Sequence, residues 1–380
     1  MINAKFFCRI KLTLAWLLSS SIFASTAVFA SSDEQGPPVH FLTGSYTAGS
    51  SEGINLFTYT PHLKTFENKG TVAVSKNPSY FALNFSHTRL YAVDESANGA
   101  INQFIWHTPT QQFKYRQRVS NVGDGPCYIA FNPAETQVAI ANYGSGDVNV
   151  FEIADRRGKL KKIANFQGKA RGKKEETSHM HFYNWESTGQ FAYSIDLGTD
   201  SVYLHKDDGF RFETEKTLSM LSGDGPRHLA FHPHKNRVYI LNELSNTLVG
   251  ADINMETGQL KAFQRINALP KNTEGKNYAA AIKFSKDGRY LYITMRGVNL
   301  VSVFKVDNEG YATVIQHISS FGDWPRDFAL SEDEKYLVVA NQKSNNLVLF
   351  KRNSDTGILS KTDIVAQLDS PTFVTPFTKP

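Results

Sequence analysis

The chain has 380 residues, a formal net charge of +5 and 20% charged residues. The first 30 residues carry three of the positive charges and no acidic residue, so the rest of the chain has a net charge of +2. That near-neutral balance argues against nucleic acid or an anionic membrane as the partner.

Residues 1–30 are predicted to form a cleaved secretion signal. Lys5, Arg9 and Lys11 precede the apolar run LTLAWLLSSSIFASTAVFA, and small residues around Ala30 provide a cleavage site. We therefore expect a secreted or periplasmic protein that has no membrane segment after cleavage. Residues 31–38 are expected to be a short linker, and residues 39–380 one domain. Cys8 leaves with the signal, so Cys127 remains alone and no internal disulfide can form.

After the linker, the segments HFLTGSYT from His40 and GINLFTYT from Gly53 resemble later strands of a sheet that lacks its first strand. A repeated segment follows, with two short apolar runs separated by a polar turn. Its six copies begin at Asn77, Gly125, Ser178, Gly225, Tyr278 and Trp324.

The period of the repeat predicts the fold. Marker positions in the six copies are separated by 48, 53, 47, 53 and 46 residues. Units of this size made of β-rich runs are typical of propeller blades, each a four-stranded sheet around a central channel. The fragment SPTFVTPF at the C-terminus places Phe373 another 46 residues on, as a first strand with no blade after it. We therefore predict an all-β, seven-bladed β-propeller whose last strand completes the N-terminal blade, which hides the exposed sheet edges.

Two columns of the repeat predict a site on one face of the ring. In each blade the start of the first strand and the end of the antiparallel second strand lie on the same face. Most turn positions are generic, but these two columns vary in their polar residues from blade to blade. They bring together Glu95, His181, Arg227, His228, Glu243, Arg296 and Arg326. Such a group is suited to binding an anion and moving a proton. By strand alternation, His228 is expected to point away from Arg227 and to be structural.

Several motifs resemble the propeller-type lactonases, a family that includes bacterial seven-bladed 6-phosphogluconolactonases and fungal carboxy-cis,cis-muconate cyclases. The resemblance covers about Val39 to Phe377. Its most specific elements are GPRH from Gly225, NEL from Asn242 and DLGTD from Asp196.

The resemblance implies an active site made of His181, Arg227, Glu243 and Arg296, with His179 as a second possibility for the histidine. Glu243 or His181 would be the general base. Arg227 and Arg296 would bind the substrate carbonyl and its phosphate or carboxylate. Arg326 and Glu95 are further candidates for substrate binding. The chain departs from the pattern in HFYNWESTG, in MRG and in its secretion signal.

The expected function is hydrolysis of a sugar lactone or phospholactone, with a small anionic lactone as substrate. Two alternatives stay open: an exported propeller that binds a ligand or protein without catalysis, and a carboxymuconate-type cyclase. The sequence contains no zinc-ligand spacing, so no metal or other cofactor is expected. Nothing in it indicates an oligomeric state.

Overall fold

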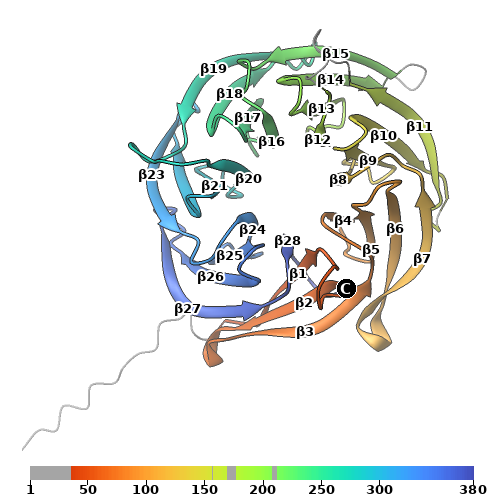
Figure 1. Ribbon diagram of the computed structural model, residues 1–380, viewed down its shortest axis with the longest axis vertical. Helices are drawn as coiled ribbons and strands as arrows, with labels where there is room; N and C mark the ends of the chain where they lie inside the picture. Colours follow the sequence, from red (N-terminus) through yellow and green to blue (C-terminus); the bar gives the residue numbers. More distant parts are fainter. Residues whose placement is uncertain (1–35, 156, 169–176, 208–211) are drawn as a thin grey trace, which may run out of the picture.

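The computed structural model describes residues 36–155, 157–168, 177–207 and 212–380. The predicted signal, 1–30, and residues 31–35 of the predicted linker lie outside these ranges. The described residues form seven four-stranded sheets arranged radially around a central channel, as Figure 1 shows. No helix within the described ranges is long and apolar enough to cross a membrane. The predicted all-β, seven-bladed propeller is confirmed.

In every blade four strands follow one another from the channel outward. In that order, blade one contains β28 (Pro371–Pro376), β1 (Val39–Ser45), β2 (Gly53–Thr60) and β3 (Thr65–Val74). Blade two contains β4 (Phe81–Leu83), β5 (Arg89–Asp94), β6 (Ala100–His107) and β7 (Gln112–Ser120). Blade three contains β8 (Pro126–Phe131), β9 (Gln137–Asn142), β10 (Asp147–Ile153) and β11 (Leu160–Gln167). Blade four contains β12 (Met180–Trp185), β13 (Phe191–Asp196), β14 (Ser201–Asp207) and β15 (Phe212–Ser219).

The remaining three blades follow the same order. Blade five contains β16 (Pro226–Phe231), β17 (Arg237–Asn242), β18 (Thr247–Ile253) and β19 (Leu260–Asn267). Blade six contains β20 (Tyr278–Phe284), β21 (Tyr290–Arg296), β22 (Leu300–Val306) and β23 (Ala312–Ser319). Blade seven contains β24 (Pro325–Leu330), β25 (Tyr336–Asn341), β26 (Asn346–Arg352) and β27 (Leu359–Gln367). Two short 3-10 helices, Pro61–Leu63 and Thr108–Thr110, lie between the third and fourth strands of blades one and two.

The C-terminal strand closes the ring. β28 pairs antiparallel with β1, with Phe41 opposite Pro376 and Gly44 opposite Phe373. β28 is therefore the innermost strand of blade one, and its label lies beside that of β1 in Figure 1. This arrangement is the predicted closure.

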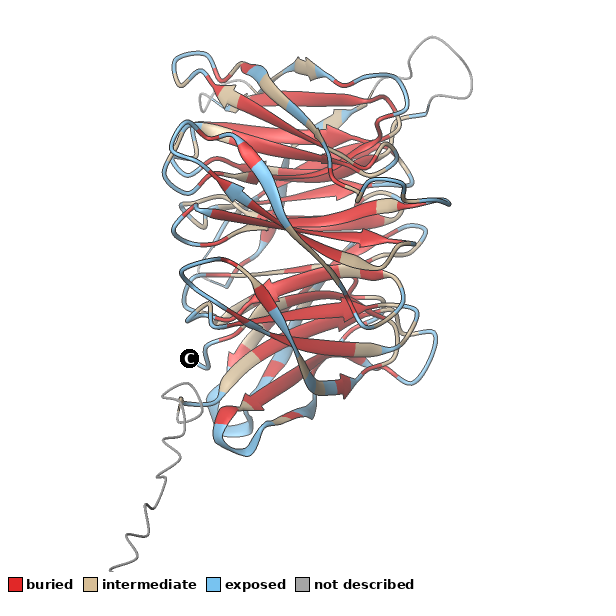
Figure 2. Ribbon diagram, turned by 90° about the vertical axis from the view of Figure 1, so that its left-hand side faces the viewer, coloured by how far each residue is buried: buried red, intermediate tan, exposed pale blue. Residues whose placement is uncertain are grey.

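Burial decreases from the channel outward because neighbouring blades cover both faces of the inner strands. In β9, β13, β17 and β25 almost every residue is buried, whereas in the outermost strands β7 and β11 most residues are exposed or half-buried. Figure 2 shows buried residues in the strand interiors and exposed residues in the loops at both faces. Charged residues on the outermost strands discourage pairing with other chains, since these strands form the sheet edges.

Tyrosines in four second strands bond each blade to the next. Tyr91, Tyr193, Tyr239 and Tyr292 each donate a hydrogen bond to a glycine carbonyl in the turn between the third and fourth strands of the following blade. The acceptors, in the same order, are the carbonyls of Gly158, Gly258, Gly310 and Gly357. The phenols are buried, so each bond satisfies a polar group that water does not reach.

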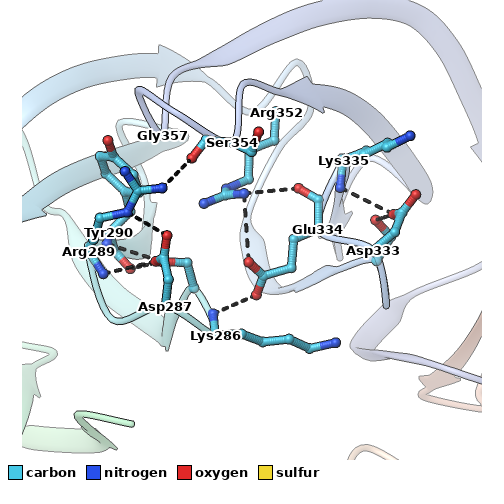
Figure 3. Close-up of polar contacts among 12 residues, drawn as sticks. Lys286, Asp287, Arg289, Tyr290, Asp333, Glu334, Lys335, Arg352, Ser354 and Gly357 are labelled. Carbon is cyan, nitrogen blue, oxygen red and sulfur yellow. Dashed lines mark hydrogen bonds and ion pairs between the residues drawn. The ribbon is translucent and has the colours of Figure 1, made fainter. Parts of the chain in front are cut away.

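A polar network connects blades six and seven at the face opposite the candidate site (Figure 3). The Lys286 backbone nitrogen donates to Glu334 Oε1 over 2.7 Å. Arg352 Nη1 donates to the Glu334 carbonyl over 3.1 Å and lies 3.7 Å from Glu334 Oε2. Arg352 also donates from Nε to the hydroxyl of Tyr292, one of the inter-blade tyrosines, over 2.6 Å. These contacts hold turns together, so we assign this charged group a structural role.

Candidate active site

A bulge at the head of the first strand orients the candidate site residues. In blade five Pro226 pairs with Asn242 and His228 with Leu241, which leaves Arg227 without a cross-strand partner. The same irregularity occurs in three other blades, where the unpaired residues are Cys127, His181 and Arg326. A bulge redirects a side chain and commonly lies beside an active site. In each of these four blades it redirects one side chain at the head of the first strand.

Glu243 joins two arginines from neighbouring blades. Its Oε2 lies 3.0 Å from Arg227 Nε and 2.8 Å from Arg296 Nη2. Arg227 Nε has no hydrogen-bond partner among the described residues, so its contact with Glu243 is an ion pair only. Arg227 and Arg296 are 3% and 6% exposed. The predicted Arg227, Glu243 and Arg296 are thus in direct contact.

Backbone carbonyls of β20 hold the same two arginines. Arg227 Nη1 donates to the Ala280 carbonyl over 2.5 Å. Arg296 donates to the carbonyls of Ala279 over 3.0 Å and Tyr278 over 3.3 Å. Small side chains at the head of β20 leave space for the guanidinium groups. Each guanidinium has five N–H donors, so the pair retains donors for a ligand.

Burial lowers the pKa of both arginines without removing their charge. Burial, followed by the nearby charge of Arg296, lowers the pKa of Arg227 to about 10. Burial also lowers the pKa of Arg296, and the Glu243 carboxylate opposes that effect. Both groups therefore stay protonated near pH 7 and present positive charge at the channel mouth.

His181 lies beside these charges with one ring nitrogen unused. Its side chain is 6% exposed, and its buried Nδ1 has no hydrogen-bond partner among the described residues. Its ring packs edge-to-face against Tyr143 and His228, with centroids 5.6 Å and 5.2 Å away. Burial and then the positive charge of Arg227 lower the pKa of His181 well below its usual value. The imidazole is therefore neutral near pH 7.

His179, the second candidate histidine, is already engaged. Its Nδ1 lies 2.8 Å from the Tyr143 carbonyl and its Nε2 3.1 Å from Thr177 Oγ1. The ring stacks on Tyr143 with centroids 4.4 Å apart. With both nitrogens in use, His179 is less suited than His181 to accept a proton.

Glu95 and Arg326 form a second charged group. Tyr46 donates to Glu95 Oε1 over 2.9 Å, and Arg326 Nη2 lies 3.7 Å from Glu95 Oε2. That Oε2 is buried and has no hydrogen-bond partner in the described chain. Arg326 Nη1 donates weakly to Gln342 over 3.5 Å. The sequence reasoning missed Tyr46, although it lies in the TGSYT motif, because blade one has no aligned copy of the repeat.

His228 does not point away from Arg227 as strand alternation predicted. Arg227 Nη1 lies 3.3 Å from His228 Nε2, and the bulge between Pro226 and His228 explains the difference because it breaks the alternation. His228 also packs against Tyr80, Tyr128 and Phe182. Tyr80 in turn contacts Phe373 with centroids 4.0 Å apart. These rings from five blades form an aromatic layer below the charged groups.

A cavity of about 530 Å³ lies at the other mouth of the channel. Tyr80, Tyr128 and Phe373 line it from the aromatic layer, and Phe85 and Trp185 line its sides. It contains none of the predicted site residues. The arginines, Glu243 and His181 lie at the opposite mouth, so this cavity is separate from the candidate site. Within the described ranges, no group of three or more His, Cys, Asp or Glu side chains could hold a metal ion.

Known proteins share this architecture and part of this sequence. The family model described as "Lactonase, 7-bladed beta-propeller" matches residues 40–376. The 6-phosphogluconolactonase of Bacillus subtilis is 31% identical over 322 residues, which cover 83% of this chain and 92% of the relative. The structure of the periplasmic gluconolactonase of Pseudomonas aeruginosa has a TM-score of 0.83 and 26% identity, covering 90% of this chain and all of that chain. A Lactobacillus plantarum protein of known structure has a TM-score of 0.83, 32% identity and the same coverage.

Proposed function

Because this chain belongs to the seven-bladed β-propeller lactonase family, we propose that it hydrolyses a sugar lactone or sugar phospholactone at the charged mouth of its channel. The observation that carries the proposal is the pair of buried arginines held by Glu243. Two adjacent guanidinium groups with unused N–H donors could stabilise the negative charge that develops on the lactone carbonyl oxygen. They could also bind an anionic substituent of the substrate.

His181 is the better placed of the two candidate bases. Its neutral ring has an Nδ1 without a hydrogen-bond partner among the described residues, whereas the Glu243 carboxylate is already paired with both arginines. An anionic substrate would offset part of the arginine charge and raise the basicity of His181. Glu243 then acts mainly by orienting Arg227 and Arg296.

The reaction would begin when the His181 imidazole removes a proton from water as the water oxygen attacks the lactone carbonyl. Arg227 and Arg296 would stabilise the oxyanion. Collapse of the tetrahedral intermediate breaks the bond to the ring oxygen, which takes the proton back from His181. The product is the open-chain hydroxy acid, and His181 returns to its neutral form.

The test is hydrolysis of freshly prepared 6-phosphogluconolactone and gluconolactone by the mature protein, each corrected for spontaneous opening. Wild type is compared with Glu243→Gln and with Glu334→Gln, since Glu334 pairs with buried Arg352 at the opposite face. We expect activity on one lactone, lost in Glu243→Gln and kept in Glu334→Gln. Absence of any rate above background would reject the proposal and favour the non-catalytic binding module or the carboxymuconate-type cyclase.

We also propose that the protein is exported and cleaved after Ala30. The support is the pattern of a basic start, an apolar run and small residues in 1–30, together with the periplasmic location in the name of the Pseudomonas relative. Mass spectrometry of the protein from a cell fractionation should find a periplasmic or secreted species beginning at Ser31. A full-length cytoplasmic species would contradict export.

A further inference from the structure

The entry into the first strand has the same unusual backbone in five blades. A residue with positive φ precedes a proline in each of them. These residues are Asn77 (41°), Gly125 (59°), Gly225 (57°), Trp324 (67°) and Ser370 (45°). Glycine and asparagine tolerate this region, but a bulky side chain there is a genuine outlier. A residue before proline is normally extended, which adds to the conflict at Trp324.

The fold does not require tryptophan at this position, because four other blades make the same turn without it. The Trp324 backbone is nevertheless fixed, since its N–H donates to Asn299 Oδ1 and its carbonyl accepts from the Gln342 N–H, both over 3.0 Å. An unfavourable conformation that the surrounding structure maintains is a recurrent feature of functional sites. The side chain is therefore the feature to explain.

The half-buried indole adjoins the charged site. Its centroid lies 5.3 Å from the Arg296 guanidinium carbon and 3.4 Å from Lys343 Nζ. Tyr278, whose carbonyl accepts from Arg296, lies 5.9 Å from it between ring centroids. Lys343 is exposed. An anionic ring-shaped ligand held by Arg296 would thus have an aromatic surface and a further cation beside it.

We propose that Trp324 determines specificity in this site, with its indole packing against the C–H face of the substrate ring while Arg296 binds a polar or anionic group. This inference rests on the proposed lactone hydrolysis and deepens it by naming how the ring is recognised. Trp324 contacts the ring and takes no part in proton transfer, so its loss weakens binding more than it slows the chemical step.

The test uses three variants. Trp324→Asn removes the indole and suits positive φ, and Trp324→Phe keeps an aromatic ring. Phe321→Asn is the matched control, because Phe321 also has positive φ (53°) but packs on Phe350 and Lys361. We expect Trp324→Asn to raise KM for gluconolactone about tenfold with little change in kcat. Trp324→Phe should be intermediate and Phe321→Asn unchanged.

A second readout separates this inference from the proposed activity. Gluconolactam, a ring-shaped analogue that resists hydrolysis, should change the tryptophan fluorescence of wild type and not that of Trp324→Asn. If wild type hydrolyses lactones and Trp324→Asn has a lower Tm but an unchanged KM, the indole is structural and the inference is overturned. If wild type is inactive but gluconolactam still changes the fluorescence only where Trp324 is present, the ring contact stands and the hydrolase proposal fails. If neither signal appears, both fail.

Discussion

Arg296 Nη2 lies 2.8 Å from Oε2 of Glu243, the same oxygen that Arg227 Nε approaches to 3.0 Å. One carboxylate from blade five therefore fixes an arginine of its own blade and an arginine of blade six. Removing either arginine would leave an incompletely paired charge in a buried setting, so structural and catalytic effects must be separated. Conservative substitutions serve this purpose better than alanine.

Replacement of Arg296 by lysine should weaken substrate binding. Lysine keeps the positive charge but cannot contact Glu243, the Tyr278 and Ala279 carbonyls and a ligand together. We expect kcat/KM to fall by roughly tenfold to a hundredfold, which corresponds to about 1.4–3 kcal/mol. The measurement is steady-state hydrolysis with the Tm of each variant.

The control for that experiment is Arg265→Lys. Arg265 forms a bidentate ion pair with Asp224, with distances of 2.8 Å and 2.6 Å. Neither residue belongs to the candidate site. This variant should lose some stability and keep wild-type kcat/KM. Equal losses of activity in both variants would show that Arg296 acts only through folding.

His181→Asn should lower kcat by roughly two to four orders of magnitude, the usual contribution of a general base. Because burial and Arg227 lower the pKa of His181 in the free enzyme, kcat/KM of wild type should stay constant as pH falls to 6.5. It should decline only at lower pH, where the base becomes protonated. An acidic limb centred above pH 6.5 would contradict this assignment.

The matched control is His205→Asn in the same blade. His205 is 1% exposed and lies 2.8 Å from both Ser194 Oγ and Thr214 Oγ1, so its replacement should reduce stability. It should leave kcat and the pH profile of activity as in wild type. If His181→Asn keeps the wild-type kcat and acidic limb, His181 is not the base.

Much of this site follows from sequence because antiparallel neighbours have a fixed geometry. Tyr278 pairs with Arg296, and Pro226 pairs with Asn242, the residue before Glu243. The repeat could therefore predict which columns meet at one face. It could not predict the bulges that redirect Arg227 and His181, because a bulge in a short, largely buried strand does not change the hydrophobic pattern of the sequence.

Other features were missed for different reasons. The turn before β24 shows no sequence sign that Trp324 has positive φ, because tryptophan is the wrong residue for it. The inter-blade tyrosines did leave a signal, since Tyr91, Tyr193, Tyr239 and Tyr292 occupy the same position in the second strands of blades two, four, five and six. Their acceptors lie 65 to 71 residues away. Pairing across that separation requires the arrangement of the blades.

The inter-blade tyrosines should contribute measurably to stability. Tyr193→Phe removes a buried hydrogen bond of 2.7 Å to the Gly258 carbonyl and should cost about 1–3 kcal/mol, because the acceptor is left unsatisfied. Tyr183→Phe is the control, since the Tyr183 hydroxyl is buried without a partner among the described residues. Chemical denaturation should show a loss for Tyr193→Phe and little change or a gain for Tyr183→Phe. The reverse order would contradict a stabilising role for the blade-to-blade bonds.

Acid should destabilise the fold below pH 6.5. Burial lowers the pKa of His205 to about 3 and that of His232 to about 4, and also lowers that of His228. The unfolded chain then binds protons that the folded chain does not, so the free energy of unfolding falls as pH decreases through 6.5. Each such histidine contributes a slope of up to about 1.4 kcal/mol per pH unit. Denaturation between pH 7.5 and 5 should show a flatter slope for His205→Asn than for wild type, and equal slopes would refute this account.

Asp327 and Lys283 should stabilise the ring closure. Asp327 Oδ2 accepts a hydrogen bond of 3.1 Å from the Val374 N–H of β28, and its Oδ1 lies 3.0 Å from Lys283 Nζ. The Lys283 ammonium also lies 3.4 Å from the Val374 carbonyl and 5.3 Å from the Phe373 ring centroid. One ion pair from blades six and seven thus contacts the strand that completes blade one.

Asp327→Asn should therefore destabilise the protein by about 1–3 kcal/mol, because the buried Asp327 carboxylate loses its charge-assisted contacts. Asp287→Asn is the control, since Asp287 pairs with the exposed Arg289 and surface pairs contribute at most about 1 kcal/mol. Hydrogen exchange gives the sharper readout, because faster exchange in Asp327→Asn should concentrate in β28 and β1. Uniform acceleration across all blades would show that Asp327 contributes only to general stability and not to closure.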